Sequence, residues 1–115
     1  MDDISYNELK KLIDNKGSYI LIDVRESDEL AHGMIPSAKH IEMDEFLNSV
    51  RLPSNEFKKI HGFSISKQYK LILYCRSGNR SAFAAKIARD LGFNAINYPG
   101  SILEWSKHDK NVKEY

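Results

Sequence analysis

Residues 70–81 read KLILYCRSGNRS, and within this stretch an apolar strand pattern gives way to a helical one. A continuous apolar run such as LILY is typical of a strand buried on both faces of a parallel sheet. Apolar residues then recur at helical spacing from Ala84 to Leu91, which predicts a helix that ends at Gly92. The only cysteine of the chain, Cys75, therefore lies where a strand leads into a helix.

This position makes Cys75 a candidate nucleophile. A cysteine at a helix N-terminus faces unpaired backbone N–H groups and the positive end of the helix dipole, and nearby arginines add charge that favours the thiolate. The same groups can hold a small oxyanion, and a glycine lets successive N–H groups converge on it. We therefore predict Cys75 as the catalytic residue in an anion-binding loop formed by Arg76, Ser77, Gly78, Asn79 and Arg80. A lone cysteine is more often an inert core residue, but two arginines and a glycine beside it argue against that interpretation.

Helix and strand patterns alternate along the rest of the chain. Helices are expected at residues 6–16, 27–32, 44–50 and 55–61 and from Ser101 onward, and strands at residues 19–22, 39–41, 70–74 and 93–98. This alternation predicts an open, mainly parallel α/β sheet covered by helices on both faces. The polar tail, residues 107–115, is expected to be loosely held.

Asp23 and Arg25 follow the predicted strand 19–22 at its carboxyl end. Ligands bind at the carboxyl ends of strands in such sheets, so this pair can meet the Cys75 loop at one site. A structural ion pair or helix cap explains the two residues as well as a direct active-site role does. Asp23 can also accept hydrogen bonds from the loop or pair with a loop arginine. We expect both residues to support the site without doing chemistry.

Length and composition suit a single domain over residues 1–115, with a core at about residues 4–107 and a polar tail at 108–115. The net charge of +1 provides no global attraction to nucleic acid or membrane. No apolar run approaches the roughly 18 residues of a membrane span, and the first residues are acidic where a signal peptide is basic. We therefore expect a cytoplasmic protein with neither nucleic acid nor a membrane as its partner.

One cysteine cannot form an internal disulfide or a thiolate zinc site, and none of the four histidines is paired at helical spacing. No metal and no cofactor are therefore expected. Because no second cysteine can take over a group bound to Cys75, that group must pass to another molecule.

Three motifs occur in order along the chain: DVRESDELAHGMIPSA at residues 23–38, CRSGNRS at 75–81 and PGSILEW at 99–105. Together they make the chain, over about residues 4–107, resemble the single-domain rhodanese-like sulfurtransferases. The resemblance implies a small, mainly parallel five-stranded sheet flanked by helices on both faces. Three residues depart from the family pattern: Met34 stands where histidine is usual, and Ser37 and Ser101 stand where glycine is common.

The resemblance also implies a mechanism. Cys75 would attack the outer sulfur of a small anionic donor such as thiosulfate, carry that sulfur as a persulfide, and pass it to an external thiol, cyanide or a protein acceptor. Arg76 and Arg80 are suited to stabilise the negative charge of the departing sulfite.

Two other functions stay open at this point. Cysteine-dependent phosphatases and arsenate reductases also surround an oxyanion with a thiolate and an arginine, but with five residues between the two. Here four residues separate Cys75 from Arg80, and the tighter ring suits a single sulfur atom better than a phosphoryl group. A non-catalytic binding or sulfur-carrier module is the third possibility, because fold alone does not decide function.

Overall fold

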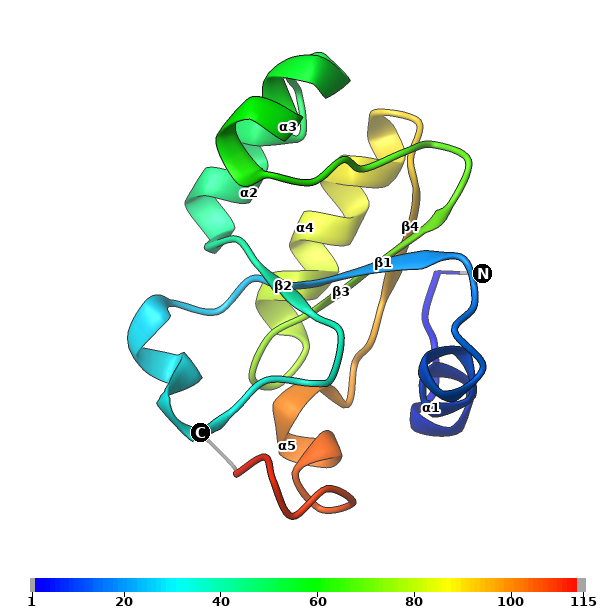
Figure 1. The fold of residues 1–115 in the computed structure, drawn as a ribbon, viewed down its shortest axis with the longest axis vertical. Coiled ribbons are helices and arrows are strands. Elements are labelled where there is room, and N and C mark those ends of the chain that lie inside the picture. The colour runs from blue at the N-terminus through cyan, green and yellow to red at the C-terminus, as the bar shows by residue number, and fades with distance from the viewer. Residues whose placement is uncertain (1, 114–115) are drawn as a thin grey trace.

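Four parallel strands form one sheet in the order β2-β1-β3-β4 (Figure 1). The computed structural model describes residues 2–113. The elements in chain order are α1 (Tyr6–Asp14), β1 (Tyr19–Asp23), the 3₁₀ helix η1 (Ser27–His32), β2 (Lys39–His40), α2 (Met43–Ser49), α3 (Ser54–His61), β3 (Lys70–Tyr74), α4 (Asn79–Asp90), β4 (Asn94–Asn97) and α5 (Ser101–Trp105).

Helices cover both faces of the sheet, as predicted. Because side chains alternate along a strand, neighbouring residues of β3 enter opposite layers. Leu71 and Leu73 pack with Cys75 in the layer formed by α2, α3 and α4, whereas Ile72 and Tyr74 pack in the layer formed by α1 and α5. In Figure 1, α2 and α3 lie above the strands, and α1 and α5 lie below them. Cys75 therefore belongs to the same layer as α4, the helix that follows it.

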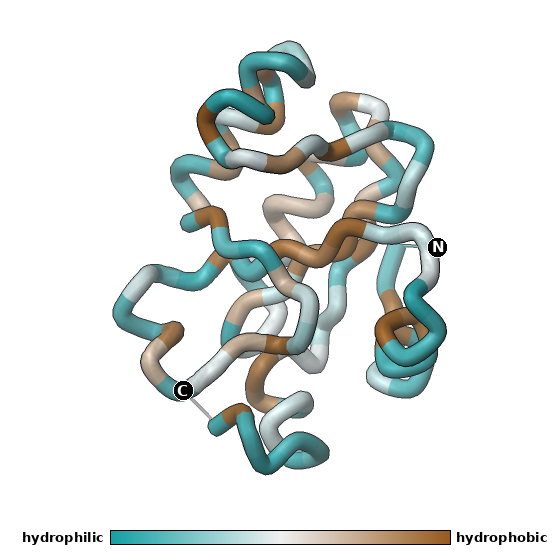
Figure 2. Tube along the Cα trace, in the orientation of Figure 1, coloured by the Kyte–Doolittle hydropathy of each residue, from teal (hydrophilic) through white to brown (hydrophobic). Residues whose placement is uncertain are grey.

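The central strands are the most hydrophobic part of the trace, and the outer helices carry more hydrophilic residues (Figure 2). The longest helix, α4, has 12 residues, whereas about 20 are needed to cross a bilayer. Within residues 2–113, no helix is long and apolar enough to span a membrane.

Within residues 2–113 the sheet has four strands rather than the five that the family resemblance implies. At the position of a fifth strand, beside β4, the N-terminal segment makes one isolated parallel bridge from Asp3 to Asn97. The Ile4 N–H donates to the Asn97 carbonyl at 2.9 Å. Ser5 then caps α1, which begins at Tyr6. The chain therefore turns into a helix directly after this bridge.

Most predicted elements are present with small changes at their ends. The strand at residues 70–74 is confirmed over its full length, and the last helix begins at Ser101. The helix predicted at 6–16 ends earlier, at Asp14, and the segment 27–32 is a 3₁₀ helix. The outer strands, β2 and β4, are shorter than predicted because each pairs with a neighbour on one side only, apart from the single bridge described above.

The prediction of a loosely held tail is wrong for the part of the tail that the structure describes. Val112 is only 4% exposed and packs in the layer of α1 and α5. The Lys113 N–H donates to the His32 carbonyl at 2.9 Å. A side chain at Gly33 would lie 3.0 Å from the Asn111 carbonyl oxygen, so this glycine leaves room for the tail. One apolar residue within a polar segment is enough to anchor it; residues 114 and 115 lie outside the described residues.

Candidate active site

The loop between β3 and α4 is shaped by Gly78, the residue that precedes the first turn of α4. Gly78 has a φ of +95°, and a Cβ there would lie 2.5 Å from the Pro99 carbonyl oxygen. Only glycine tolerates both the left-handed backbone and this close approach. The Asn97 side chain donates to the Gly78 carbonyl at 3.3 Å. The loop therefore closes tightly against the end of β4.

Hydrogen-bond donors converge on the sulfur of Cys75. The Gly78 N–H lies 3.1 Å from Cys75 Sγ, and the Ser81 hydroxyl lies 3.5 Å from it. Burial raises the pKa of the thiol, but the Ser81 hydroxyl and the backbone N–H groups of Ser81, Gly78 and Ser77 lower it more, so the pKa lies below its usual value. Cys75 itself is only 1% exposed. The fold therefore stabilises a thiolate in a largely buried position.

Replacing Ser81 with alanine is expected to raise the pKa of Cys75, because the hydroxyl contributes the largest of the lowering effects. The rate of Cys75 alkylation by iodoacetamide, measured against pH, should show its midpoint moved to higher pH. Ser106→Ala is a matched control, since its hydroxyl donates to the Leu103 carbonyl and not to the sulfur. A midpoint that stays in place in Ser81→Ala would show that the backbone N–H groups alone stabilise the thiolate.

The closing turn at residues 99–101 and the start of α5 hydrogen-bond to the main chain of Cys75. The Ser101 hydroxyl accepts a hydrogen bond from the Cys75 N–H at 3.1 Å and donates to the Tyr98 carbonyl at 2.8 Å. The Ile102 N–H donates to the Cys75 carbonyl at 3.1 Å. Ser101 is fully buried, so these bonds satisfy backbone groups that water does not reach.

Ser37 and Ser101, two of the departures from the family pattern, share an unusual backbone. Their φ angles are 73° and 53°, in the left-handed region that favours glycine. A non-glycine residue there costs roughly 1–2 kcal/mol. Both hydroxyls are hydrogen-bonded, that of Ser37 to the Tyr19 hydroxyl at 2.7 Å. These geometries explain why glycine is common at both positions and what serine adds there.

Asp23 and Arg25 form a structural ion pair, one of the alternatives that the sequence left open. Both are fully buried, and Arg25 donates to both carboxylate oxygens of Asp23 at 2.7–3.0 Å. Arg25 also donates to the carbonyls of Glu29 and Gly33, each at 3.0 Å. Within residues 2–113 neither side chain hydrogen-bonds to the loop at residues 75–80. Asp23 does not pair with a loop arginine because Arg25, two residues away, already occupies its oxygens.

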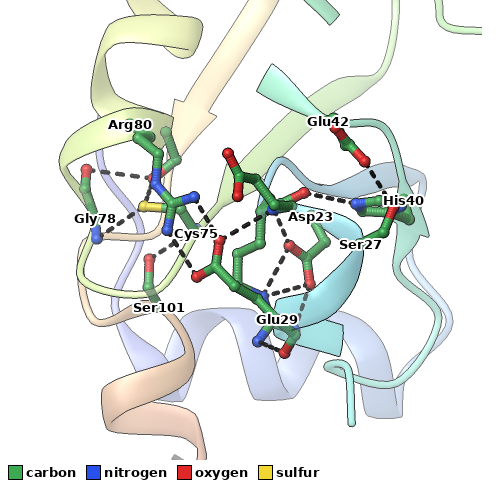
Figure 3. A network of polar contacts seen from close by, with 12 residues as sticks. Asp23, Ser27, Glu29, His40, Glu42, Cys75, Gly78, Arg80 and Ser101 are labelled. Atoms are coloured by element: carbon green, nitrogen blue, oxygen red, sulfur yellow. Dashed lines mark hydrogen bonds and ion pairs between the residues drawn. The ribbon is translucent and has the colours of Figure 1, made fainter. Parts of the chain in front are cut away.

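Glu29 connects this ion pair to the cysteine loop. Its carboxylate accepts two hydrogen bonds from Arg80, at 2.7 and 3.0 Å, and its backbone carbonyl accepts the bond from Arg25. Figure 3 shows Glu29 between Arg80 and Cys75 on one side and Asp23 on the other. Sequence reasoning placed Glu29 in a motif but gave it no role. Its partner lies 51 positions away, and no local pattern reveals such a contact.

The other loop residues lie on the outer side of the site. Arg76, Ser77 and Asn79 are exposed, and Arg80 is partly buried. In this arrangement they can contact an incoming ligand. Their role in binding the sulfur donor stays a prediction. Within residues 2–113, no three histidine, cysteine, aspartate or glutamate side chains are grouped closely enough to hold a metal ion.

A cavity of about 590 Å³ lies away from this loop, at the far end of α4. Its lining includes Phe57, Leu91 and Phe93 and none of residues 75–80. This cavity is therefore not part of the Cys75 site, where only a small anion has to bind.

Comparison with known proteins places this site in a family context. A model of the rhodanese-like domain matches residues 5–108. A Drosophila melanogaster rhodanese domain-containing protein is 38% identical over 108 residues, covering 91% of this chain and 96% of the relative. The Saccharomyces cerevisiae protein named thiosulfate sulfurtransferase RDL2, mitochondrial, is 32% identical over 113 residues, covering 95% and 76%. The structure of the human single-domain sulfurtransferase TSTD1 superposes with a TM-score of 0.86 at 28% identity, covering 95% of this chain and 98% of that one.

Proposed function

Because the chain belongs to the rhodanese-like domain family, we propose that it is a thiosulfate sulfurtransferase that works through a persulfide on Cys75. The observation that carries the proposal is the convergence of the Gly78 N–H and the Ser81 hydroxyl on Cys75 Sγ, with the pKa of the thiol lowered as a result. The name of RDL2 supports the same activity, and the name of TSTD1 supports sulfur transfer.

In the first step, the Cys75 thiolate attacks the outer sulfur of thiosulfate. The bond between the two sulfur atoms of the donor breaks, and sulfite leaves with the electron pair. The outer sulfur stays on Cys75 as a persulfide anion, so total charge is conserved. We assign binding of the sulfur donor to the loop residues, whose cations and N–H groups suit the leaving anion: Arg76, Ser77, Gly78, Asn79 and Arg80.

In the second step, a thiophilic acceptor attacks the outer sulfur of the persulfide, and the Cys75 thiolate is released. Cyanide becomes thiocyanate in this step, and a thiol becomes a persulfide. Since the chain has one cysteine, no internal thiol can resolve the persulfide. The acceptor is therefore a separate molecule, a small thiol or a protein. Asp23 and Arg25 act only by supporting the loop through Glu29. The cytoplasmic location stays a prediction.

The test is the intact mass of the protein after incubation with thiosulfate. We expect the addition of one sulfur atom, located on the peptide that contains Cys75, and its loss after cyanide or a thiol is added. No adduct, or an adduct that no acceptor removes, would contradict the proposal. An adduct that only a protein acceptor removes would instead identify the chain as a dedicated sulfur carrier.

A further inference from the structure

Arg80 does not present its full charge to a donor, because Glu29 holds it in a two-bond ion pair. The pair measures 2.7 and 3.0 Å, and the Glu29 side chain is only 15% exposed. The hydrogen bonds from Arg80 hold the pKa of the Glu29 carboxyl below its usual value, so Glu29 is ionised at neutral pH. The Glu26 N–H also donates to this carboxylate at 3.0 Å. Glu29 is therefore an anion held firmly in place.

This anion lies beside the cysteine loop, on the side of Arg80 (Figure 3). Arg80 belongs to the first turn of α4, beside the thiol (Figure 3). The hydrogen bonds to Glu29 raise the pKa of Arg80, and the charge of the Cys75 thiolate adds a smaller rise. Glu26 contributes in the same direction, more weakly than Glu29. A donor that reaches Cys75 therefore meets negative charge as well as the arginines.

We propose that Glu29 determines the charge selectivity of the sulfur-donor site, lowering its preference for dianionic donors relative to monoanionic donors of the same shape. The inference rests on the proposed function and deepens it. A carboxylate repels a dianion more than a monoanion of similar size and shape. Glu29 thereby admits donors of lower charge, such as organic thiosulfonates, alongside thiosulfate. It acts through charge and through Arg80, not by touching the reacting sulfur.

Two donors isolate the effect of charge. Thiosulfate carries two negative charges, and methanethiosulfonate replaces one oxygen of thiosulfate with a methyl group and carries one. In each case the Cys75 thiolate attacks the terminal sulfur, the sulfur–sulfur bond breaks, and sulfite or methanesulfinate leaves with the electron pair. The measured quantity is the second-order rate constant of persulfide formation for each donor, at low ionic strength because salt screens the effect. The ratio of the two constants cancels changes in the reactivity of Cys75 itself.

In Glu29→Gln, the thiosulfate-to-methanethiosulfonate ratio should rise about fivefold, as expected for removing one full charge beside the donor site at an intermediate effective dielectric constant. Glu29→Ala is a second neutral variant with the same expectation, so the test does not depend on one variant folding. Arg80→Gln should lower the ratio, since it removes the cation and leaves the Glu29 carboxylate. Glu56→Gln, which removes an exposed carboxylate on α3, is the matched control and should leave the ratio unchanged.

A ratio that is unchanged or falls in both neutral Glu29 variants would overturn the inference, even if the individual rates change. Equal losses with both donors would mean that Glu29 only positions Arg80. These outcomes differ from failure of the proposed function, in which the wild-type protein forms no persulfide with either donor.

Discussion

Cys75→Ser is expected to fold like the wild-type protein and to form thiocyanate from thiosulfate and cyanide at the background rate only, a loss of roughly 10³-fold or more. A serine hydroxyl is not ionised at neutral pH, and oxygen cannot carry sulfur as a persulfide. The serine oxygen can still accept the hydrogen bond that the Gly78 N–H donates to the sulfur in the wild-type protein. The variant therefore separates chemistry from folding. Steady-state thiocyanate formation measures the catalytic activity, and the midpoint of thermal unfolding measures the stability of the fold.

Turnover that persists in Cys75→Ser with the fold intact would remove Cys75 from the mechanism. Hydrolysis of an aryl phosphate should be tested alongside, because a cysteine-dependent phosphatase would also lose its activity in this variant. We expect the wild-type protein to be a poor phosphatase. Only four residues separate Cys75 from Arg80, and Glu29 already binds Arg80 in a two-bond ion pair. Phosphate hydrolysis faster than persulfide formation would reverse the assignment.

Arg25→Met is expected to lower the free energy of unfolding by about 3–5 kcal/mol, because it leaves the Asp23 carboxylate fully buried without its cation. The carbonyls of Glu29 and Gly33 also lose the donors that Arg25 supplies. A domain of this size is typically stable by about 5–15 kcal/mol, so the loss is a large part of the total. Urea unfolding, followed by circular dichroism, measures the change.

Two further variants test whether the loss of stability comes from the unpaired buried carboxylate. Arg51→Met removes an exposed arginine and should change stability by less than about 0.5 kcal/mol. The double variant Asp23→Leu with Arg25→Met leaves no buried carboxylate and should recover part of the loss, as found for buried ion pairs replaced by apolar residues. A loss below about 1 kcal/mol in Arg25→Met would show that water or a local rearrangement stabilises Asp23.

The parts of the fold that the sequence predicts well depend on close neighbours. The apolar run predicts the strand at residues 70–74. The capping box formed by Ser5 and Glu8 predicts the start of α1, and Gly92 predicts the end of α4. The position of Cys75 between strand and helix follows from the same local patterns. The number of strands and the packing of the tail are not local properties. The number of strands depends on how far the segment at Asp3 pairs with β4, and the packing of the tail depends on the burial of Val112.

The candidate site divides in the same way. The sequence alone predicted the candidate nucleophile and the position of its loop, because the strand before Cys75 and the helix after it are encoded by residues a few positions apart. Only the tertiary structure decided what surrounds that loop. The parallel pairing of β1 with β3 brings their carboxyl ends together, and Glu29, in the 3₁₀ helix after β1, then meets Arg80 after β3. The charge that a donor meets thus depends on a contact between residues 51 positions apart, which no spacing or periodicity in the sequence encodes.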